Sequence, residues 1–201
     1  MKIENILLNS EKPSDELREL FSKVEKYKEY PFDMLYKLKD VPQSKLHHPE
    51  GDVWIHTLMV VNEASKIKDK SKNKRKLMWA ALMHDVGKFD TTRERKGKIT
   101  AYDHDKVSAR KTKEFFEFFS EDEDFIKDVV ALVRWHMQPL FVVKNLPFAD
   151  IENMLKEVDI EELSLLCLCD RIGRGELEQK RIEEEKENMK IFKRKVLEKK
   201  R

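Results

Sequence analysis

Few residues in this sequence can break a helix or cross-link the chain. Of its 201 residues, five are glycine, six are proline and two are cysteine. Scarce glycine and proline disfavour a strand-rich fold with many tight turns and favour long helices. Cys167 and Cys169 lie two positions apart in a leucine-rich run, so we interpret them as buried thiols of a protein from a reducing compartment.

The sequence also lacks a long apolar run and an excess of charge of either sign. No segment approaches the ~20 apolar residues that a membrane-spanning helix needs. Lys2 and Glu4 place charged side chains at the start of the sequence, which disfavours a signal peptide. We therefore expect a soluble, cytoplasmic protein without a membrane partner. The net charge is +2, and bulk charge therefore does not require nucleic acid as a partner.

The remaining pattern predicts an all-α protein. We divide it into an N-terminal helical extension (1–46), a central metal-binding domain (47–175) and a charged C-terminal helix (176–201). We expect a polar loop over 89–103 and helices over 14–27, 31–39, 52–68, 75–84, 103–120, 121–136, 147–158 and 160–172. The C-terminal helix has one apolar seam, which indicates either packing on the body or assembly into a homo-oligomer.

His84 and Asp85 form the most informative pair. They end the 75–84 helix, which is apolar almost all round and is therefore expected to run through the centre of the domain; Gly87 is suited to end it. Neighbouring residues diverge by about 100° around a helix, but at a helix end both side chains can reach an ion beyond it. Asp85 has two oxygens, so it could bridge two ions while His84 holds one.

Four further residues complete a candidate ligand set. His56 and His136 lie on the apolar stripes of their predicted helices, Asp170 ends a third stripe, and His104 opens the 103–120 helix. A buried carboxylate without a partner is costly, so Asp170 needs one. We expect His56 and Asp170 to join His84 and Asp85 around one ion, and His104 and His136 to hold a second.

Imidazoles and carboxylates are both available as metal ligands near neutral pH. Mixed nitrogen and oxygen ligation favours one or two divalent transition-metal ions, of iron, manganese, nickel, cobalt or zinc; magnesium stays a candidate for a single-ion site. The two remaining histidines, His47 and His48, lie in a turn beside a proline, and we expect both to be exposed to solvent.

At these positions the sequence resembles the HD superfamily of metal-dependent phosphohydrolases, named for the His-Asp pair matched by His84-Asp85. The superfamily's ligand order is matched by His56, His84-Asp85, His104, His136 and Asp170. Segments 54–60, 82–88 and 169–175 are similar to the HD domain attached to bacterial CCA-adding tRNA nucleotidyltransferases. The similarity covers about 50–175. Residues 1–50 contain no glycine and hence no glycine-rich nucleotide-binding turn, so CCA addition is not implied.

The resemblance implies a helical bundle around a metal and hydrolysis of a phosphomonoester or phosphodiester. The expected partner is a small-molecule phosphoester such as a nucleotide or a cyclic phosphate. We assign catalysis to Asp85 and Lys88, and contacts with the substrate phosphate to Lys88, Arg134, Arg171 and Arg174, with Arg174 favoured among the arginines. Two alternatives stay open: a di-iron oxygenase, since some HD proteins with six ligands use iron and oxygen, and a non-catalytic nucleotide-sensing module.

Overall fold

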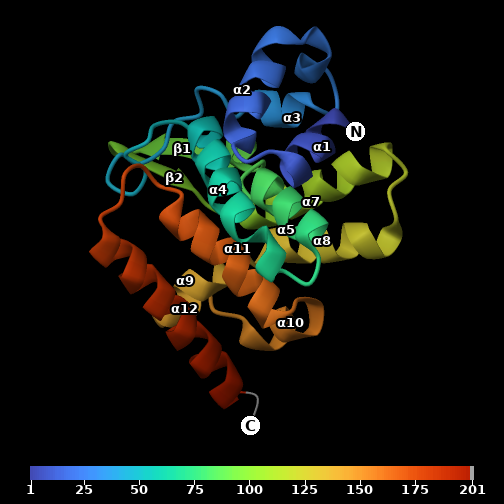
Figure 1. The fold of residues 1–201 in the computed structure, drawn as a ribbon. Coiled ribbons are helices and arrows are strands. Elements are labelled where there is room, and N and C mark those ends of the chain that lie inside the picture. Colours follow the sequence, from blue (N-terminus) through green and yellow to red (C-terminus); the bar gives the residue numbers. More distant parts are fainter. Residues whose placement is uncertain (200–201) are drawn as a thin grey trace.

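The computed structural model describes residues 1–199 and shows a helical bundle with one small β-hairpin (Figure 1). The prediction of an all-α fold is confirmed. Its elements are α1 (Lys2–Asn9), α2 (Pro13–Lys23), η1 (Glu25–Lys28), α3 (Asp33–Tyr36), α4 (Val53–Ile67), η2 (Lys68–Lys70), α5 (Lys74–Met83), α6 (Lys88–Thr91), β1 (Thr92–Arg95), β2 (Lys98–Ala101), α7 (His104–Phe118), α8 (Glu123–Trp135), α9 (Gln138–Val143), α10 (Ile151–Glu157), α11 (Ile160–Ile172) and α12 (Gln179–Lys199).

Helix α5 is the centre of the bundle, as its sequence predicted. Every residue from Leu77 to Met83 is buried, and the helix contacts α1, α4, α8 and α11. Its first turn is capped by the side chain of Asn73, which accepts a hydrogen bond from the backbone N–H of Lys76. Asp52 caps α4 in the same way, through the N–H of Ile55 at 2.8 Å. These caps fix the residue at which each of the two helices begins.

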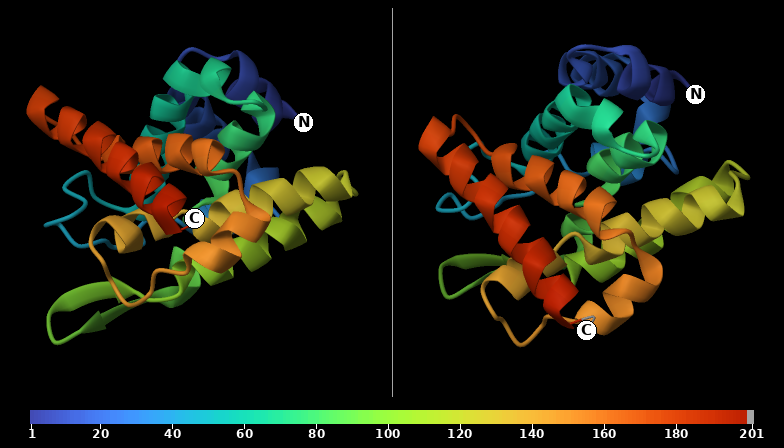
Figure 2. Two further views of the ribbon diagram at one scale, coloured as in Figure 1. Left: turned by 90° about the horizontal axis from the view of Figure 1, so that it is seen from below. Right: turned by 60° about the horizontal axis from the view of Figure 1, so that its bottom comes forward.

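The connection from α5 to α7 differs from the expected loop over 89–103. It forms α6 and an antiparallel hairpin in which Thr92–Arg95 pairs with Lys98–Ala101. The two turn residues, Lys96 and Gly97, have φ of 51° and 71°, the left-handed region that two-residue hairpin turns require. The hairpin projects from the helical body (Figure 2). Strand β1 has no apolar residue and β2 has only Ile99 and Ala101, both half-buried, which is why hydrophobic periodicity did not reveal the hairpin.

The N-terminal segment contains more helices than expected. We predicted two, over 14–27 and 31–39, but α1 precedes them, α2 ends at Lys23, and only the short α3 follows Pro31. Helix α1 packs on α5 and α2 packs on α4, so this segment covers one side of the two central helices (Figure 1). The buried side chains of Ile3, Ile6 and Leu7 anchor α1 and belong to the same core as α5.

The segment between α8 and α11 also corrects the sequence prediction. The sequence predicted no helix at α9, in whose first turn Pro139 lies; there its missing N–H and fixed φ cost nothing. The following helix, α10, begins at Ile151 rather than at Pro147, with the side chain of Asp150 capping it. Cys167 and Cys169 are buried in α11 and form no disulfide, as predicted.

The C-terminal helix α12 folds back against α11 and α9 of the same chain. Its seam residues Met189, Phe192 and Val196 are buried there. Of the two roles open for this seam, packing on the body is the observed one, and the seam is not free to join copies of the chain. Within residues 1–199, no helix has both the length and the apolar content to cross a bilayer.

Candidate metal centre

Six histidine and aspartate side chains from five helices meet in the middle of the bundle. Each is at most 8% exposed to solvent. They are His56 of α4, His84 and Asp85 at the end of α5, His104 at the start of α7, His136 at the end of α8, and Asp170 of α11. All six candidate ligands from the sequence are therefore brought together, although they span more than a hundred residues of chain.

Asp85 occupies the centre of the cluster and faces two groups of histidines with its two oxygens. Its Oδ2 lies 3.2 Å from His84 Nε2 and 3.7 Å from His56 Nε2. Its Oδ1 lies 3.4 Å from His104 Nε2 and 3.8 Å from His136 Nε2. Each oxygen of this one carboxylate thus belongs to a separate half of the cluster.

Asp170 belongs to the half that contains His56 and His84. Its Oδ1 lies 3.1 Å from His56 Nε2. Arg174, four residues later and just beyond the end of α11, donates hydrogen bonds to both carboxylate oxygens of Asp170 and to its backbone carbonyl. The carboxylate that sequence analysis expected to need a partner therefore has two. Burial alone would raise its pKa, but Arg174 and His56 outweigh burial and hold the pKa well below its usual range.

The four histidines share one orientation. Each places its Nδ1 next to a backbone carbonyl oxygen: His56 at 3.0 Å from Gly173, His84 at 2.9 Å from Ala81, His104 at 2.7 Å from Ala101 and His136 at 2.7 Å from Val133. A carbonyl can only accept a hydrogen bond, so the ring proton sits on Nδ1. Each Nε2 then points into the cluster, which is the arrangement that metal-binding histidines use.

Inside the cluster, the Nε2 atoms of His84, His104 and His136 face no hydrogen-bond donor among residues 1–199, whereas His56 Nε2 lies next to Asp170. His84 Nε2 is buried and makes no hydrogen bond within residues 1–199. His104 Nε2 and His136 Nε2 lie 3.2 Å apart, with two acceptor lone pairs facing each other. Burial lowers the pKa of His136 to about 4 and also lowers that of His104, so both rings are neutral near pH 7. A divalent cation fits these converging lone pairs, since it would replace the missing donors.

Two glycines bring the helices close enough for this geometry. A Cβ on Gly87 would lie 2.5 Å from the backbone N of Ser108 and 2.6 Å from His104 O. Sequence analysis gave Gly87 the role of ending α5, but its φ is −77°, and the observed role is to let α7 approach Asp85. Gly173 has a matching role, since a Cβ there would lie 2.9 Å from backbone atoms of Val60.

Lys88 extends from the start of α6 into the cluster. Its Nζ lies 2.7 Å from Asp85 Oδ2 and donates a hydrogen bond of 2.8 Å to the side chain of Gln43. Gln43 is buried and donates in turn to the backbone carbonyl of Asp52. Sequence analysis named Lys88 but missed Gln43, because a residue in a loop carries no periodic signal.

The three arginines named in the sequence occupy different surroundings. Only Arg174 binds a carboxylate of the cluster. Arg134 pairs with Asp105, the residue after His104, and stacks on the ring of Trp135. Arg171 donates to the buried Glu185 of α12 and so faces away from the cluster.

A short turn beside α4 holds two residues whose positions the sequence did not predict. His47 is exposed as expected, but His48 is not: its side chain is 12% exposed and its ring packs edge-on against His56. Glu50, which sequence analysis did not single out, is buried between these two rings. Their spacing before His56 gave no hint of this, because the turn folds back on the helix that follows it.

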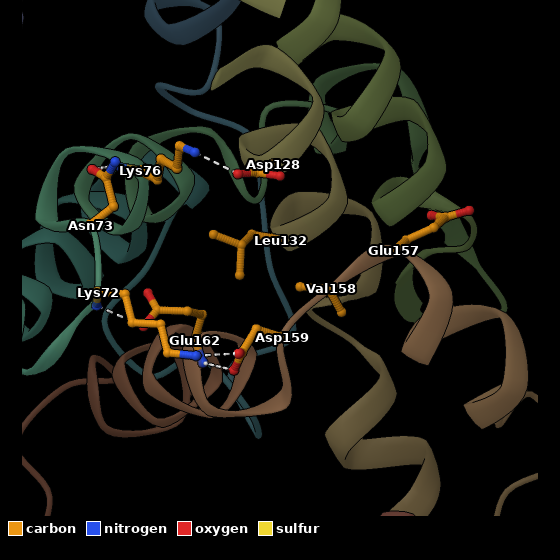
Figure 3. Close-up of a pocket in the computed structure, with 9 residues that line it drawn as sticks. All are labelled: Lys72, Asn73, Lys76, Asp128, Leu132, Glu157, Val158, Asp159 and Glu162. Atoms are coloured by element: carbon orange, nitrogen blue, oxygen red, sulfur yellow. Dashed lines mark hydrogen bonds and ion pairs between the residues drawn. The ribbon is translucent and has the colours of Figure 1, made fainter. Parts of the chain in front are cut away.

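A pocket of about 200 Å³ lies elsewhere, between α5, α8, α10 and α11 (Figure 3). Its charged side chains bind one another: Lys72 pairs with Asp159 and Lys76 pairs with Asp128. None of its lining residues belongs to the histidine and aspartate cluster. We therefore place the candidate site at the cluster and not at this pocket.

Comparison with known proteins points to the same part of the chain. A protein-family model described as "HD domain" matches residues 53–175, a span that contains all six cluster residues. The Multifunctional CCA protein of Mannheimia succiniciproducens is 30% identical over 164 residues, covering 74% of this chain and 36% of that protein. The protein of the same name from Halorhodospira halophila is 32% identical over 142 residues, covering 67% and 32%.

A shorter match has higher identity. The Multifunctional CCA protein of Actinobacillus pleuropneumoniae is 43% identical over 63 residues, which is 31% of this chain and 15% of that protein. This chain thus spans about a third or less of the length of these curated relatives.

Proposed function

This chain belongs to the HD domain family, within the superfamily of metal-dependent phosphohydrolases, and from that premise we propose that it hydrolyses a small phosphomonoester or phosphodiester. The proposed substrate class is a nucleotide or a cyclic phosphate. The observation that carries the proposal is the convergence of four histidine Nε2 atoms on the two oxygens of Asp85, in a buried place where three of these nitrogens face no hydrogen-bond donor among residues 1–199.

The proposed ligands form two sets that share Asp85. His56, His84, Asp85 Oδ2 and Asp170 would hold one ion, and Asp85 Oδ1, His104 and His136 a second. Mixed imidazole and carboxylate donors suit iron, manganese, nickel, cobalt or zinc better than magnesium. A bound ion would supply a water of lowered pKa as nucleophile and would polarise a phosphoryl oxygen.

Lys88 is the proposed cation for the substrate phosphate at this site. It is buried, its Nζ lies 2.7 Å from Asp85, and Gln43 fixes its direction. A lysine held in this way can donate a hydrogen bond to a phosphoryl oxygen and can balance the charge that develops during hydrolysis. Its ordering by Gln43 before substrate arrives reduces the reorganisation that the reaction requires.

Arg174 is the second proposed phosphate-binding residue, because its bonding partner Asp170 lies in the cluster. Arg134 and Arg171 would have to leave Asp105 and Glu185 to reach a phosphate. We therefore place the phosphate contacts on Lys88 and Arg174 and leave the other two arginines out of the mechanism.

The test combines metal analysis with a substrate screen. Protein loaded with Mn²⁺, Ni²⁺ or Co²⁺ is incubated with nucleotides, cyclic nucleotides and simple phosphoesters, and the products are quantified. We expect turnover that Asp85→Ala abolishes while Asp90→Asn, a change at an exposed aspartate five residues later, retains it. Thermal melting of both variants checks that they are folded.

Three outcomes separate this proposal from the two alternatives. Metal-replete protein that turns over none of the phosphoesters would contradict it. Bound iron with a mixed-valent spectroscopic signal and oxygen uptake would instead favour the di-iron oxygenase. Tight nucleotide binding without turnover would favour the nucleotide-sensing module.

A further inference from the structure

Glu50 is a carboxylate that the metal cluster does not include, yet it is buried against one of the proposed ligands. Its side chain is only 2% exposed. Its Oε1 lies 2.9 Å from His56 Nδ1 and 2.9 Å from His48 Nδ1. Its Oε2 is buried and has no hydrogen-bond partner among residues 1–199. A buried charge in such a place is costly unless its neighbours stabilise it.

A second histidine ring holds the Glu50 side chain in place. The Nδ1 atom of His48 lies 2.9 Å from Glu50 Oε1, the same oxygen that faces His56. Glu50 thus places a buried carboxylate oxygen beside the outer nitrogen of His56.

The backbone around Glu50 holds it in this position. The turn is closed by hydrogen bonds from the N–H groups of His47 and His48 to Ser44 O, at 3.0 and 2.8 Å. It packs against the α11–α12 connection, where a Cβ on Gly175 would lie 3.2 Å from Pro49 Cγ (Figure 1). The carboxylate therefore reaches His56 from a turn that two segments of the chain restrain.

His56 differs in this respect from the other three histidines of the cluster. Each of those directs Nδ1 to the carbonyl three residues earlier in its own segment, a neutral acceptor. His56 Nδ1 lies next to Gly173 O at 3.0 Å and also next to the Glu50 carboxylate. The carbonyl alone fixes the ring tautomer; the carboxylate adds negative charge, which makes the opposite nitrogen of the ring a stronger donor to a metal.

We propose that Glu50 is a positioning residue that acts through His56: it orients the ring and strengthens its Nε2 as a metal ligand. This inference rests on the proposed function, in that the cluster must bind a divalent ion. In Glu50→Gln the neutral amide keeps the size and one acceptor oxygen of the Glu50 side chain but removes its negative charge.

The test measures metal affinity and not activity. Mn²⁺ is titrated into the metal-free protein by calorimetry, for the wild type, Glu50→Gln and His47→Gln. We expect Glu50→Gln to weaken binding by about 10–100-fold, the usual effect of losing a carboxylate partner of a ligating histidine. His47→Gln changes an exposed neighbour in the same turn and should bind Mn²⁺ like the wild type.

A second measurement does not depend on a variant. Nitrogen-15 spectra of the histidine side chains in the metal-free wild type should show His56 protonated at Nδ1. A His56 ring without a proton on Nδ1, or a loss of Mn²⁺ affinity below about tenfold in Glu50→Gln, would overturn the role of Glu50. If the wild type itself binds no Mn²⁺, both the proposed function and this inference fail. If the wild type binds Mn²⁺ and Glu50→Gln binds it equally well, only this inference fails.

Discussion

The Nε2 atoms of His104 and His136 lie 3.2 Å apart while both Nδ1 atoms bind backbone carbonyls. Two imidazole lone pairs therefore face each other in a buried place, next to Oδ1 of Asp85. Such a pair is unfavourable by itself and becomes favourable with a shared cation. It defines the second half of the cluster as a candidate site separate from the half formed by His56, His84 and Asp170.

Removing one ligand of this second half should remove one ion. In His104→Gln we expect the Mn²⁺ content to fall from two equivalents to one, because the ligands around Asp85 Oδ2 remain. The measurement is elemental analysis after dialysis against a Mn²⁺ buffer, with His47→Gln as the control. Retention of both ions, or loss of both, would show that the two halves do not act as separate sites.

Lys88 should affect turnover more than metal binding. In Lys88→Met we expect kcat to fall by about 10²-fold, the usual effect of losing one donor to developing charge. Mn²⁺ affinity should be unchanged or higher, because the lysine cation 2.7 Å from Asp85 repels the ion. Lys37→Met, at a half-exposed lysine, is the matched control. A variant that keeps its kcat but loses metal affinity would contradict this role.

Even the smallest side chain at position 87 should destabilise the fold. A Cβ there would lie 2.5–2.6 Å from backbone atoms of α7, so Gly87→Ala must displace that helix. We expect a loss of about 1–3 kcal/mol in the free energy of unfolding, the range found for overpacking. Urea denaturation measures it. At Gly97 a Cβ would meet nothing within 4 Å and asparagine tolerates positive φ, so Gly97→Asn should stay within about 0.5 kcal/mol. Equal stability of the two variants would refute the close approach.

Acidification should destabilise the metal-free protein. The pKa of His136 is lowered from 6.5 to about 4, chiefly by burial, and that of His104 is lowered too. Between pH 6.5 and 4 the unfolded chain therefore binds more protons at these rings than the folded chain does. Their contribution to stability is fully present above pH 6.5 and is lost as the pH falls through this range.

His84 opposes this trend, because the carboxylate of Asp85 outweighs burial and raises its pKa. The pKa values of three histidines, His48, His104 and His136, are lowered, and these outnumber His84, so we expect the urea midpoint of metal-free protein to fall from pH 7 to pH 5. His136→Phe should reduce the slope. A midpoint that rises on acidification would contradict the neutral state of the buried rings.

The central part of the fold and the candidate ligands could be predicted because they carry periodic signals. Helix α5 is apolar on all sides, and the stripe that contains Val60 and Ala64 placed His56 inward. Helix geometry also explains Arg171, which is adjacent to Asp170 in α11 and points about 100° away, toward Glu185. Arg174 lies beyond the end of α11, so helix geometry does not explain its contact with Asp170.

The remaining features depend on contacts between distant segments that no local pattern records. Glu50 and Gln43 lie in loops, and their roles arise only when the loop folds back on His56 and Lys88. In the β1–β2 hairpin, β1 has no apolar residue and β2 has only Ile99 and Ala101, an alternation too short to identify a strand.

Anomalous X-ray diffraction from crystals grown with Mn²⁺ tests the central claim most directly. The account predicts a peak within coordination distance of Asp85 Oδ2, His56 Nε2 and His84 Nε2, and at full loading a second peak beside His104 and His136. Crystals that contain Mn²⁺ only at surface carboxylates, with no peak next to Asp85, would contradict the account.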